Sequence, residues 1–487
     1  MSLRQKTISG VLWTGAAKMS MQVVLVIVQA VLARLLSKAD FGIVGMAGLI
    51  TVAIGMVNDK GLGTAIIQKK EIKPPQLSTM FWVSVMFGLL LYGASAAASI
   101  PISLFFQNRL VKPVILVIAL GFFIGGFAIV HKSLLTRQMQ FKKLAIIEIS
   151  SVTVSGIIAV ILAFHNFGVW SLVANVLLRD AFTVIGVWMA CTWRPNFHFA
   201  LQEFKEFYRF SSNVLTNDVM IYLVMNADIT IIGRILGEVA LGIYNWALYL
   251  VKLPVQRISG IVAKVVFPAF SHVQNDIKRF KAGYLRSMTF ISLITFPMLI
   301  ALGVFAREFI IIFLTEKWIE VVIPLQILVP MAMLKSVGTI KGSVLMAVGR
   351  PDIELKWNVF YLLPLIGAVW FGTRWGLIGV AASFSALYLV TWPIIQDITN
   401  RQINVSPAEF LSAFSVTGPA TASMLVFGYV SRWLLKDVLN FGDLIVLLLG
   451  LLIAGLCYIV SLQILDRTLM TELRNLFIRQ KATTEVA

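Results

Sequence analysis

The sequence predicts an all-α polytopic membrane protein with about 14 transmembrane helices, arranged as two parallel six-helix repeats, or lobes, and two further C-terminal helices. Of its 487 residues, 59% are hydrophobic and only 13% are charged, a composition far more apolar than that of water-soluble domains. The apolar residues fall into long segments, and a short motif recurs after 200 residues. These observations exclude a water-soluble fold and indicate a duplicated helical bundle.

Fourteen segments are expected to cross the bilayer, since about 20 apolar residues in a helix span its hydrocarbon core. They are residues 10–34, 40–58, 78–103, 111–131, 144–164, 168–190, 210–233, 240–260, 285–306, 319–340, 357–373, 376–396, 408–433 and 442–464.

The duplication is indicated by Arg34–Ile43, RLLSKADFGI, and Arg234–Ile243, RILGEVALGI, which are identical at four of ten positions. Each copy ends one apolar segment and begins the next, so we expect the same helix-turn-helix corner in two related halves. Phe167–Ala174 and Trp375–Ala382 likewise begin apolar segments, 208 residues apart. Because six is an even number, the two halves are expected to insert in the same orientation.

The chain is therefore expected to have four parts. They are an N-lobe of helices one to six (1–194), an interfacial amphipathic linker (195–209), a C-lobe of helices seven to twelve (210–398), and helices thirteen and fourteen with a cytoplasmic tail (399–487). In the linker, Phe197, Leu201, Phe204 and Tyr208 share one helical face, which favours a helix lying in the membrane interface. A solvated linker is the alternative.

The net charge of +18 is explained by membrane topology rather than by nucleic-acid binding. With a cytoplasmic N-terminus, the inner side carries 29 of the 41 basic residues and the opposite side 10, while Lys18 and Arg179 fall inside spans. Lys and Arg concentrate on cytoplasmic loops. Both termini are therefore expected to be cytoplasmic.

Four basic residues at membrane depth are the candidate substrate-binding residues of a cationic lumen. They are Lys18, Arg179, Lys252 and Lys335. A charge near the bilayer centre costs about 3 kcal/mol or more, so such residues usually face the bundle interior and mark a pathway. The alternatives are static ion pairs, or long side chains that reach the interface.

Three acids, Asp180, Asp218 and Asp228, are candidate sites for a coupling ion or counter-ions to the nearby bases. Asp218 lies at about the same depth in helix seven as Lys18 in helix one, roughly 12 Å from the cytoplasmic end. The two therefore occupy equivalent positions of the repeat.

Enzymatic chemistry has no support in the sequence. There is no glycine-rich phosphate-binding loop followed by Lys-Ser/Thr, and four scattered histidines with Cys191 and Cys457 have no metal-ligand spacing. The short loops on the non-cytoplasmic side leave no room for a folded catalytic domain. We therefore expect no enzyme activity, metal or cofactor, and H+ or Na+ as a possible coupling ion.

Several short motifs give the chain a family resemblance that covers nearly its whole length. They are Met1–Gly10, Ala65–Ile72, Val266–Phe270 with Gln274–Asp276, Glu316–Trp318, Lys335–Gly338 and Gly342–Ala347. With them the chain resembles the Wzx-type polysaccharide flippases (O-antigen and colanic acid) of the multidrug/oligosaccharidyl-lipid/polysaccharide exporter superfamily.

The resemblance implies a two-lobed bundle in the bacterial inner membrane, with multiple spans, that works by alternating access. It also implies a flippase for undecaprenyl-diphosphate-linked oligosaccharide in exopolysaccharide or lipopolysaccharide biosynthesis. The expected partners are this lipid-linked substrate, membrane lipids and the polysaccharide polymerase and chain-length machinery, with no nucleic acid. The alternatives are a multidrug or small-cation exporter of the same superfamily, which needs an anionic cavity, and a membrane glycosyltransferase or polymerase acting on the same lipid.

Overall fold

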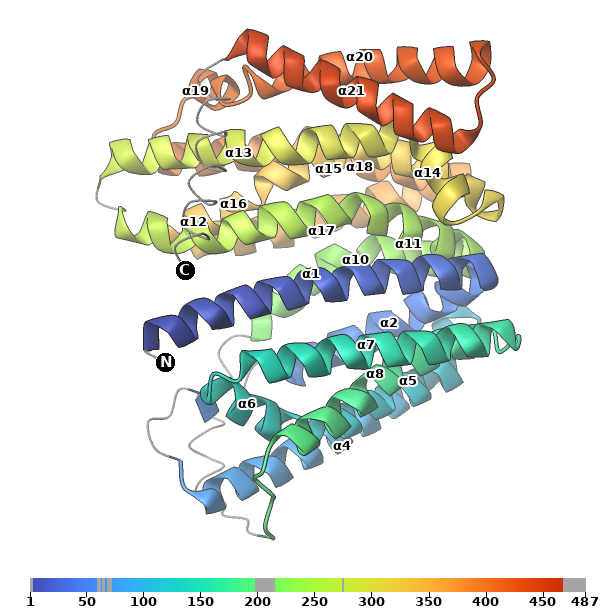
Figure 1. Ribbon diagram of the computed structural model, residues 1–487, viewed down its shortest axis with the longest axis vertical. Coiled ribbons are helices and arrows are strands. Elements are labelled where there is room, and N and C mark those ends of the chain that lie inside the picture. The colour runs from blue at the N-terminus through green and yellow to red at the C-terminus, as the bar shows by residue number, and fades with distance from the viewer. Residues whose placement is uncertain are drawn as a thin grey trace. The chain divides into compact units, whose positions relative to one another are not determined.

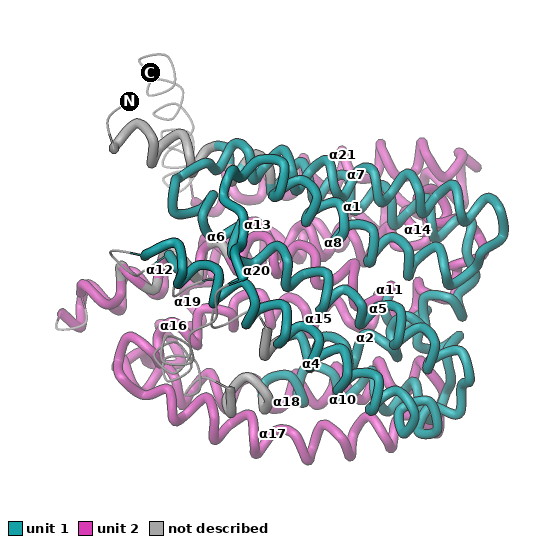
Figure 2. The backbone as a smooth tube through the Cα atoms, turned by 90° about the horizontal axis from the view of Figure 1, so that it is seen from below, with its two compact units in different colours: residues 1–245 teal, residues 246–487 magenta. Residues whose placement is uncertain are grey.

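The computed structural model describes residues 3–58, 63, 66–67, 72–197, 215–273 and 276–466. The chain divides into two compact units, residues 1–245 and 246–487, which Figure 2 shows in separate colours. Within the described ranges, all regular secondary structure is helical. The predicted all-α fold class is confirmed.

Unit 1 contains the first helices of the chain, which Figure 1 labels, and part of the second copy of the repeat. Its helices are α1 (Leu3–Leu35), α2 (Lys38–Asn58), α4 (Pro74–Phe106), α5 (Val111–Gly126), α6 (Ile129–Arg137), α7 (Phe141–Phe164), α8 (Val169–Ala190), α10 (Leu215–Ile235) and the first residues of α11 (Gly237–Pro254).

Unit 2 continues from Trp246 within α11. Its further elements are the π-helix η2 (Val255–Ser259), α12 (Gly260–His272), α13 (Ile277–Val304), α14 (Ala306–Phe313), η3 (Glu316–Val321), α15 (Val322–Gly338), α16 (Ile340–Ala347), α17 (Pro351–Gly372), η4 (Thr373–Trp375), α18 (Gly376–Gln402), α19 (Pro407–Ser412), α20 (Thr417–Trp433), the π-helix η5 (Leu434–Val438) and α21 (Asp443–Leu465).

The predicted apolar segments are largely helical in the described ranges, but 111–131 is divided between α5 and α6 and 408–433 between α19 and α20. By length and hydropathy, nine helices in these ranges are able to cross a membrane, and ten if α5 and α6 form one span bent by 46°. The chain is thus a multi-pass membrane protein, while the number of fourteen spans stays a prediction. Leu201, Phe204 and Tyr208 of the predicted interfacial linker lie outside the described residues, and the boundaries of the four predicted parts stay predictions too.

The duplicated corner predicted from the sequence is present in both copies. In the first copy α1 ends at Leu35 and α2 begins at Lys38; in the second, α10 ends at Ile235 and α11 begins at Gly237. The second pair of related segments agrees as well. Gly168 before α8 and Gly376 at the start of α18 have φ angles of +54° and +65°, a left-handed conformation that glycine adopts without steric cost.

The two copies of the corner pack directly against each other inside unit 1. A Cβ atom on Gly42 would lie 1.8 Å from the carbonyl oxygen of Glu238, and one on Gly242 would lie 2.0 Å from that of Lys38. Each glycine thus faces the residue four positions before the other glycine. This reciprocity is characteristic of a local two-fold relation. The backbones of α2 and α11 meet at a crossing that only glycine permits, and we call these four residues the glycine crossing.

The rest of unit 1 is held by close helix packing and by an aromatic cluster. Ser84 of α4 donates a hydrogen bond to the Gly126 carbonyl at the end of α5, at 2.9 Å, as small residues and short polar side chains commonly do between membrane helices. Trp188 of α8 donates to the Phe127 carbonyl at 2.9 Å and stacks on buried His131 with 4.5 Å between ring centroids. These contacts fix α8 to the bend between α5 and α6.

Buried polar contacts join helices of unit 2 that are far apart in sequence. Tyr284 of α13 donates to the side-chain oxygen of Asn400 in α18 at 2.8 Å, with both residues buried. Arg432 of α20 forms an ion pair of 2.8 Å with Glu308 of α14, whose side chain has no exposed surface. A buried charge requires such a partner, so this pair attaches the C-terminal helices to the rest of unit 2.

Candidate functional site

Lys18 and Arg179 both lie in unit 1, on different helices. Lys18 is in α1 with an exposed side chain. Arg179 is in α8, where its Nε lies 3.7 Å from Oδ1 of Asp180, and the two side chains are 41% and 36% exposed. Among the described residues no contact joins Lys18 to Arg179. Arg179 therefore combines a nearby counter-ion with an accessible guanidinium, and its role in substrate binding stays a prediction.

The carboxylate of Asp180 occupies a niche against α5. A Cβ atom on Gly121 would lie 2.9 Å from Oδ2 of Asp180, so the absence of a side chain at Gly121 makes room for the acid. Lys132, which itself pairs with Glu148 at 2.8 Å, also acts electrostatically on Asp180. Two bases, Arg179 and Lys132, and two acids, Asp180 and Glu148, thus form a mixed charged group.

Asp228 is the most enclosed of the candidate acids whose side chains the structure describes. It is 3% exposed, and its Oδ2 accepts a hydrogen bond of 2.8 Å from the hydroxyl of Tyr244 across the α10–α11 corner. Its Oδ1 accepts one of 2.9 Å from the Ile229 amide. No ion pair to Asp228 occurs within the described ranges, and its two carboxylate oxygens are held by these hydrogen bonds. The side chain of Asp218 lies outside the described residues.

Lys252 and Lys335 belong to unit 2. Lys252 is partly buried two residues before Pro254, which ends α11, and Lys335 is partly buried in the last turn of α15. The four predicted bases are thus divided equally between the two units, and the single cationic lumen remains a prediction.

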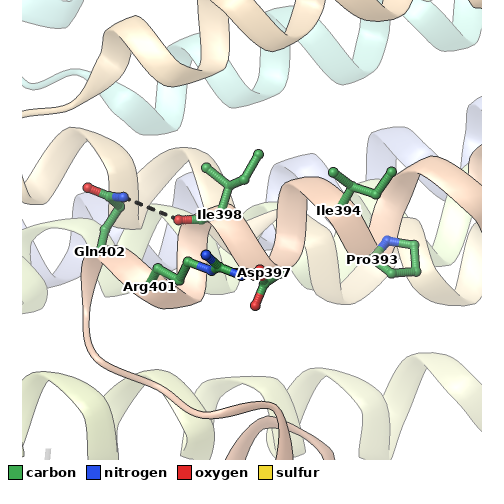
Figure 3. A pocket seen from close by; sticks show the side chains of 6 residues that line it. All are labelled: Pro393, Ile394, Asp397, Ile398, Arg401 and Gln402. Atoms are coloured by element: carbon green, nitrogen blue, oxygen red, sulfur yellow. Dashed lines mark hydrogen bonds and ion pairs between the residues drawn. The ribbon is translucent and has the colours of Figure 1, made fainter.

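One groove in unit 2 runs along the end of α18 (Figure 3). It has a volume of about 540 Å³ and is lined by Pro393, Ile394, Asp397, Ile398, Arg401 and Gln402. Arg401 pairs with Asp397 at 2.7 Å, and Gln402 donates to the Ile398 carbonyl at 3.3 Å. Its polar groups therefore satisfy one another along a single helix.

A second cavity, of about 380 Å³, lies inside unit 1 between α2, α4 and α10, and we call it the apolar cleft. It is lined by Leu49, Ile50, Ala53, Ile102, Phe105, Phe106, Tyr222, Leu223 and Thr230. Seven of these nine residues are apolar. It does not contain any of the predicted site residues.

Sequence reasoning missed the glycine crossing, the Asp228–Tyr244 contact and the apolar cleft. The two glycines of the crossing occupy the same position of the repeated motif, but this shows only that the copies are related and not that they touch. The other two features depend on which helices are neighbours, which periodicity does not report. Among the described residues, no group of three or more His, Cys, Asp or Glu side chains is arranged to hold a metal ion.

Comparison with known proteins adds a family and a fold. Residues 31–323 match the family described as "Polysaccharide biosynthesis protein". The chain is 29% identical to "Lipopolysaccharide biosynthesis protein WzxC" of Escherichia coli (strain K12), over 80% of each chain. It is also 29% identical to "Teichuronic acid biosynthesis protein TuaB" of Bacillus subtilis (strain 168), over 88% of this chain and 89% of the relative. A third relative, "Succinoglycan biosynthesis transport protein ExoT" of Rhizobium meliloti (strain 1021), is 24% identical over 91% and 90% of the two chains.

Two solved structures have a similar fold. "Lipid II flippase MurJ, inward closed conformation" aligns with a TM-score of 0.74 at 15% identity, covering 94% of this chain and all of that one. An inward-facing multidrug resistance MATE family transporter of the MOP superfamily aligns with a TM-score of 0.63, also at 15% identity, over 79% and 94% of the chains. The fold is therefore that of MurJ-like and MATE-like transporters.

Proposed function

Because the chain belongs to the polysaccharide biosynthesis protein family, we propose that it is a flippase for polyprenyl-diphosphate-linked oligosaccharide. It moves this lipid by alternating access across the bacterial inner membrane, for the synthesis of a surface or secreted polysaccharide. The observation that carries the proposal is that family membership coincides with a MurJ-like fold over nearly the whole chain. Relatives named for polysaccharide biosynthesis and transport, aligned over most of the chain, support it.

The chemistry of the substrate suits the residues at membrane depth. Its diphosphate is anionic, and Arg179 offers an accessible guanidinium, a group that binds phosphate through paired hydrogen bonds. Buried Asp228 is the candidate for binding a coupling H+ or Na+. The flippase acts by binding and conformational change rather than by bond cleavage, and we therefore propose no catalytic residue or cofactor. Association with the polymerase and chain-length machinery stays a prediction.

The function is tested by deleting the gene and analysing lipid-linked oligosaccharides in the two leaflets of the inner membrane. We expect one such lipid to accumulate in the cytoplasmic leaflet and to disappear when the gene is restored. A deletion strain in which no lipid-linked oligosaccharide accumulates contradicts a flippase.

The same deletion strain separates the proposal from its two rivals. A multidrug or small-cation exporter predicts increased sensitivity to cationic drugs, with lipid-linked sugars unchanged. A glycosyltransferase or polymerase predicts that the accumulating lipid carries an incomplete or unpolymerised glycan and lies in the leaflet where that enzyme acts.

The expected membrane orientation follows from the distribution of basic residues. Reporter fusions after Lys73, Lys143 and Lys281, and at both termini, should report a cytoplasmic location, because Lys and Arg favour that side. Reporter activity should be measured for an enzyme active only in the cytoplasm and for one active only outside. An external signal at any of these loops would contradict the predicted topology of fourteen spans.

A further inference from the structure

We propose that the apolar cleft of unit 1 is a lipid-binding site that holds one hydrocarbon chain of a lipid with an anionic phosphate headgroup. The cleft is formed by three helices that are far apart in sequence, α2, α4 and α10. None of the charged residues predicted at membrane depth is among its lining residues. The site goes beyond the proposed function, because it does not depend on which lipid is transported.

The lining of the cleft specifies a hydrocarbon ligand. Its two hydroxyl groups are already engaged, since Tyr222 donates to the Leu49 carbonyl and Thr230 donates to the Asn226 carbonyl at 2.9 Å. The remaining wall is aliphatic and aromatic. A polar ligand in this cleft would lose its hydrogen bonds to water and find no free hydroxyl in return. An apolar chain has no such hydrogen bonds to lose. The volume of about 380 Å³ is in the range of about 300–1,000 Å³ typical of small-molecule sites.

A cation next to one lining residue of the cleft favours an anionic headgroup. Phe105 is 44% exposed, and the guanidinium of Arg234, in the last turn of α10, lies 5.7 Å from the centre of its ring. Arg carries five donors and remains charged, so it can bind a phosphate while it retains other contacts. Arg234 thus places a cation beside Phe105, one of the residues that line the cleft.

The binding test uses native mass spectrometry of the purified full-length chain with two added lipids in separate arms. One is palmitoyl-oleoyl phosphatidylglycerol, and the other is undecaprenyl diphosphate without sugar. Only the second arm rests on the proposed function. Ala53→Phe fills the cleft from α2, and Ala97→Phe places the same ring on an exposed position of α4 that does not line it.

We expect Ala53→Phe to weaken binding of at least one lipid by about tenfold or more, since losing even two buried methylenes has this effect. Ala97→Phe should bind like the unaltered chain. Weakening in the phosphatidylglycerol arm identifies a resident phospholipid, and weakening in the undecaprenyl arm identifies the carrier lipid. Equal binding by the two variants in both arms overturns the proposal and leaves only non-specific lipid around the protein.

The headgroup contact has its own matched control. Arg374 lies 5.1 Å from the ring of Phe371 and 5.6 Å from that of Trp370, which resembles the setting of Arg234, but it does not border the cleft. Arg234→Gln should reduce the preference for phosphatidylglycerol over phosphatidylcholine, whereas Arg374→Gln should not. Equal effects of the two substitutions would remove Arg234 from the site. Because these readouts measure binding, a failed export assay and a failed binding assay remain distinguishable.

Discussion

Replacing Gly42 or Gly242 by alanine should lower the melting temperature of the purified protein and severely reduce export. The added Cβ would lie 1.8 Å or 2.0 Å from a backbone carbonyl oxygen of the facing helix, and a backbone atom cannot move aside as the end of a flexible side chain can. Carbon contacts are favourable only near 3.5–4.0 Å or beyond. The helices would therefore have to separate, at a cost of about 1–3 kcal/mol for overpacking.

The matched control is Gly48→Ala in the same helix, where the new Cβ meets nothing within 4 Å. Alanine is a better helix former than glycine by about 1 kcal/mol, so this control should keep or raise the melting temperature. The two substitutions in α2 are thus expected to change the melting temperature in opposite directions. A Gly42→Ala protein as stable as the Gly48→Ala protein would show that the crossing is looser than described.

Sequence reasoning anticipated the helices and the repeated corner because both are local consequences of hydropathy. An apolar segment long enough to span a bilayer must be helical, since no water is available to satisfy its backbone. The contact between the two corners was not anticipated, because identity at Gly42 and Gly242 indicates common origin and not that the copies touch. Their contact depends on α2 and α11 being neighbours, which hydropathy does not determine.

Only part of the candidate site could be predicted from the sequence, because hydropathy is a local property. Hydropathy gives the depth of a charge along its helix but not the helix it faces. Arg179 and Asp180 are adjacent in sequence, so their pairing needed no tertiary information. The niche at Gly121 and the hydroxyl of Tyr244 that binds Asp228 come from neighbouring helices. Burial of Glu308 likewise depends on Arg432, which is 124 residues away.

Neutralising Arg179 should lower export at least about tenfold at unchanged protein level, because a hydrogen bond to a charged group contributes about 1.5–3 kcal/mol. Arg179→Lys should restore export in part, since lysine keeps the charge without the planar fork. Lys18→Gln should act in the same direction. Export is measured as mature polysaccharide per cell, and protein level by immunoblot of the membrane fraction.

The matched control is Arg401, which pairs with Asp397 at 2.7 Å on an open groove in α18. Arg401→Gln breaks a comparable Arg–Asp pair outside the predicted lumen, so export should change little, because exposed pairs contribute about 0–1 kcal/mol. An equal loss of export in Arg179→Gln and Arg401→Gln would show that both arginines act through the overall charge of the protein and not through contact with the substrate. Full export from Arg179→Gln would remove Arg179 from substrate binding.

Asp180→Asn decides whether the pair with Arg179 is structural or competes with the substrate. If Asp180 only fixes the helix, its neutralisation should lower the melting temperature and export together, as Arg179→Gln would. If Asp180 holds Arg179 until the diphosphate displaces it, export should fall much less than in Arg179→Gln. We expect the second result, because the contact is 3.7 Å long and both side chains remain more than one-third exposed, so the pair itself contributes little to stability.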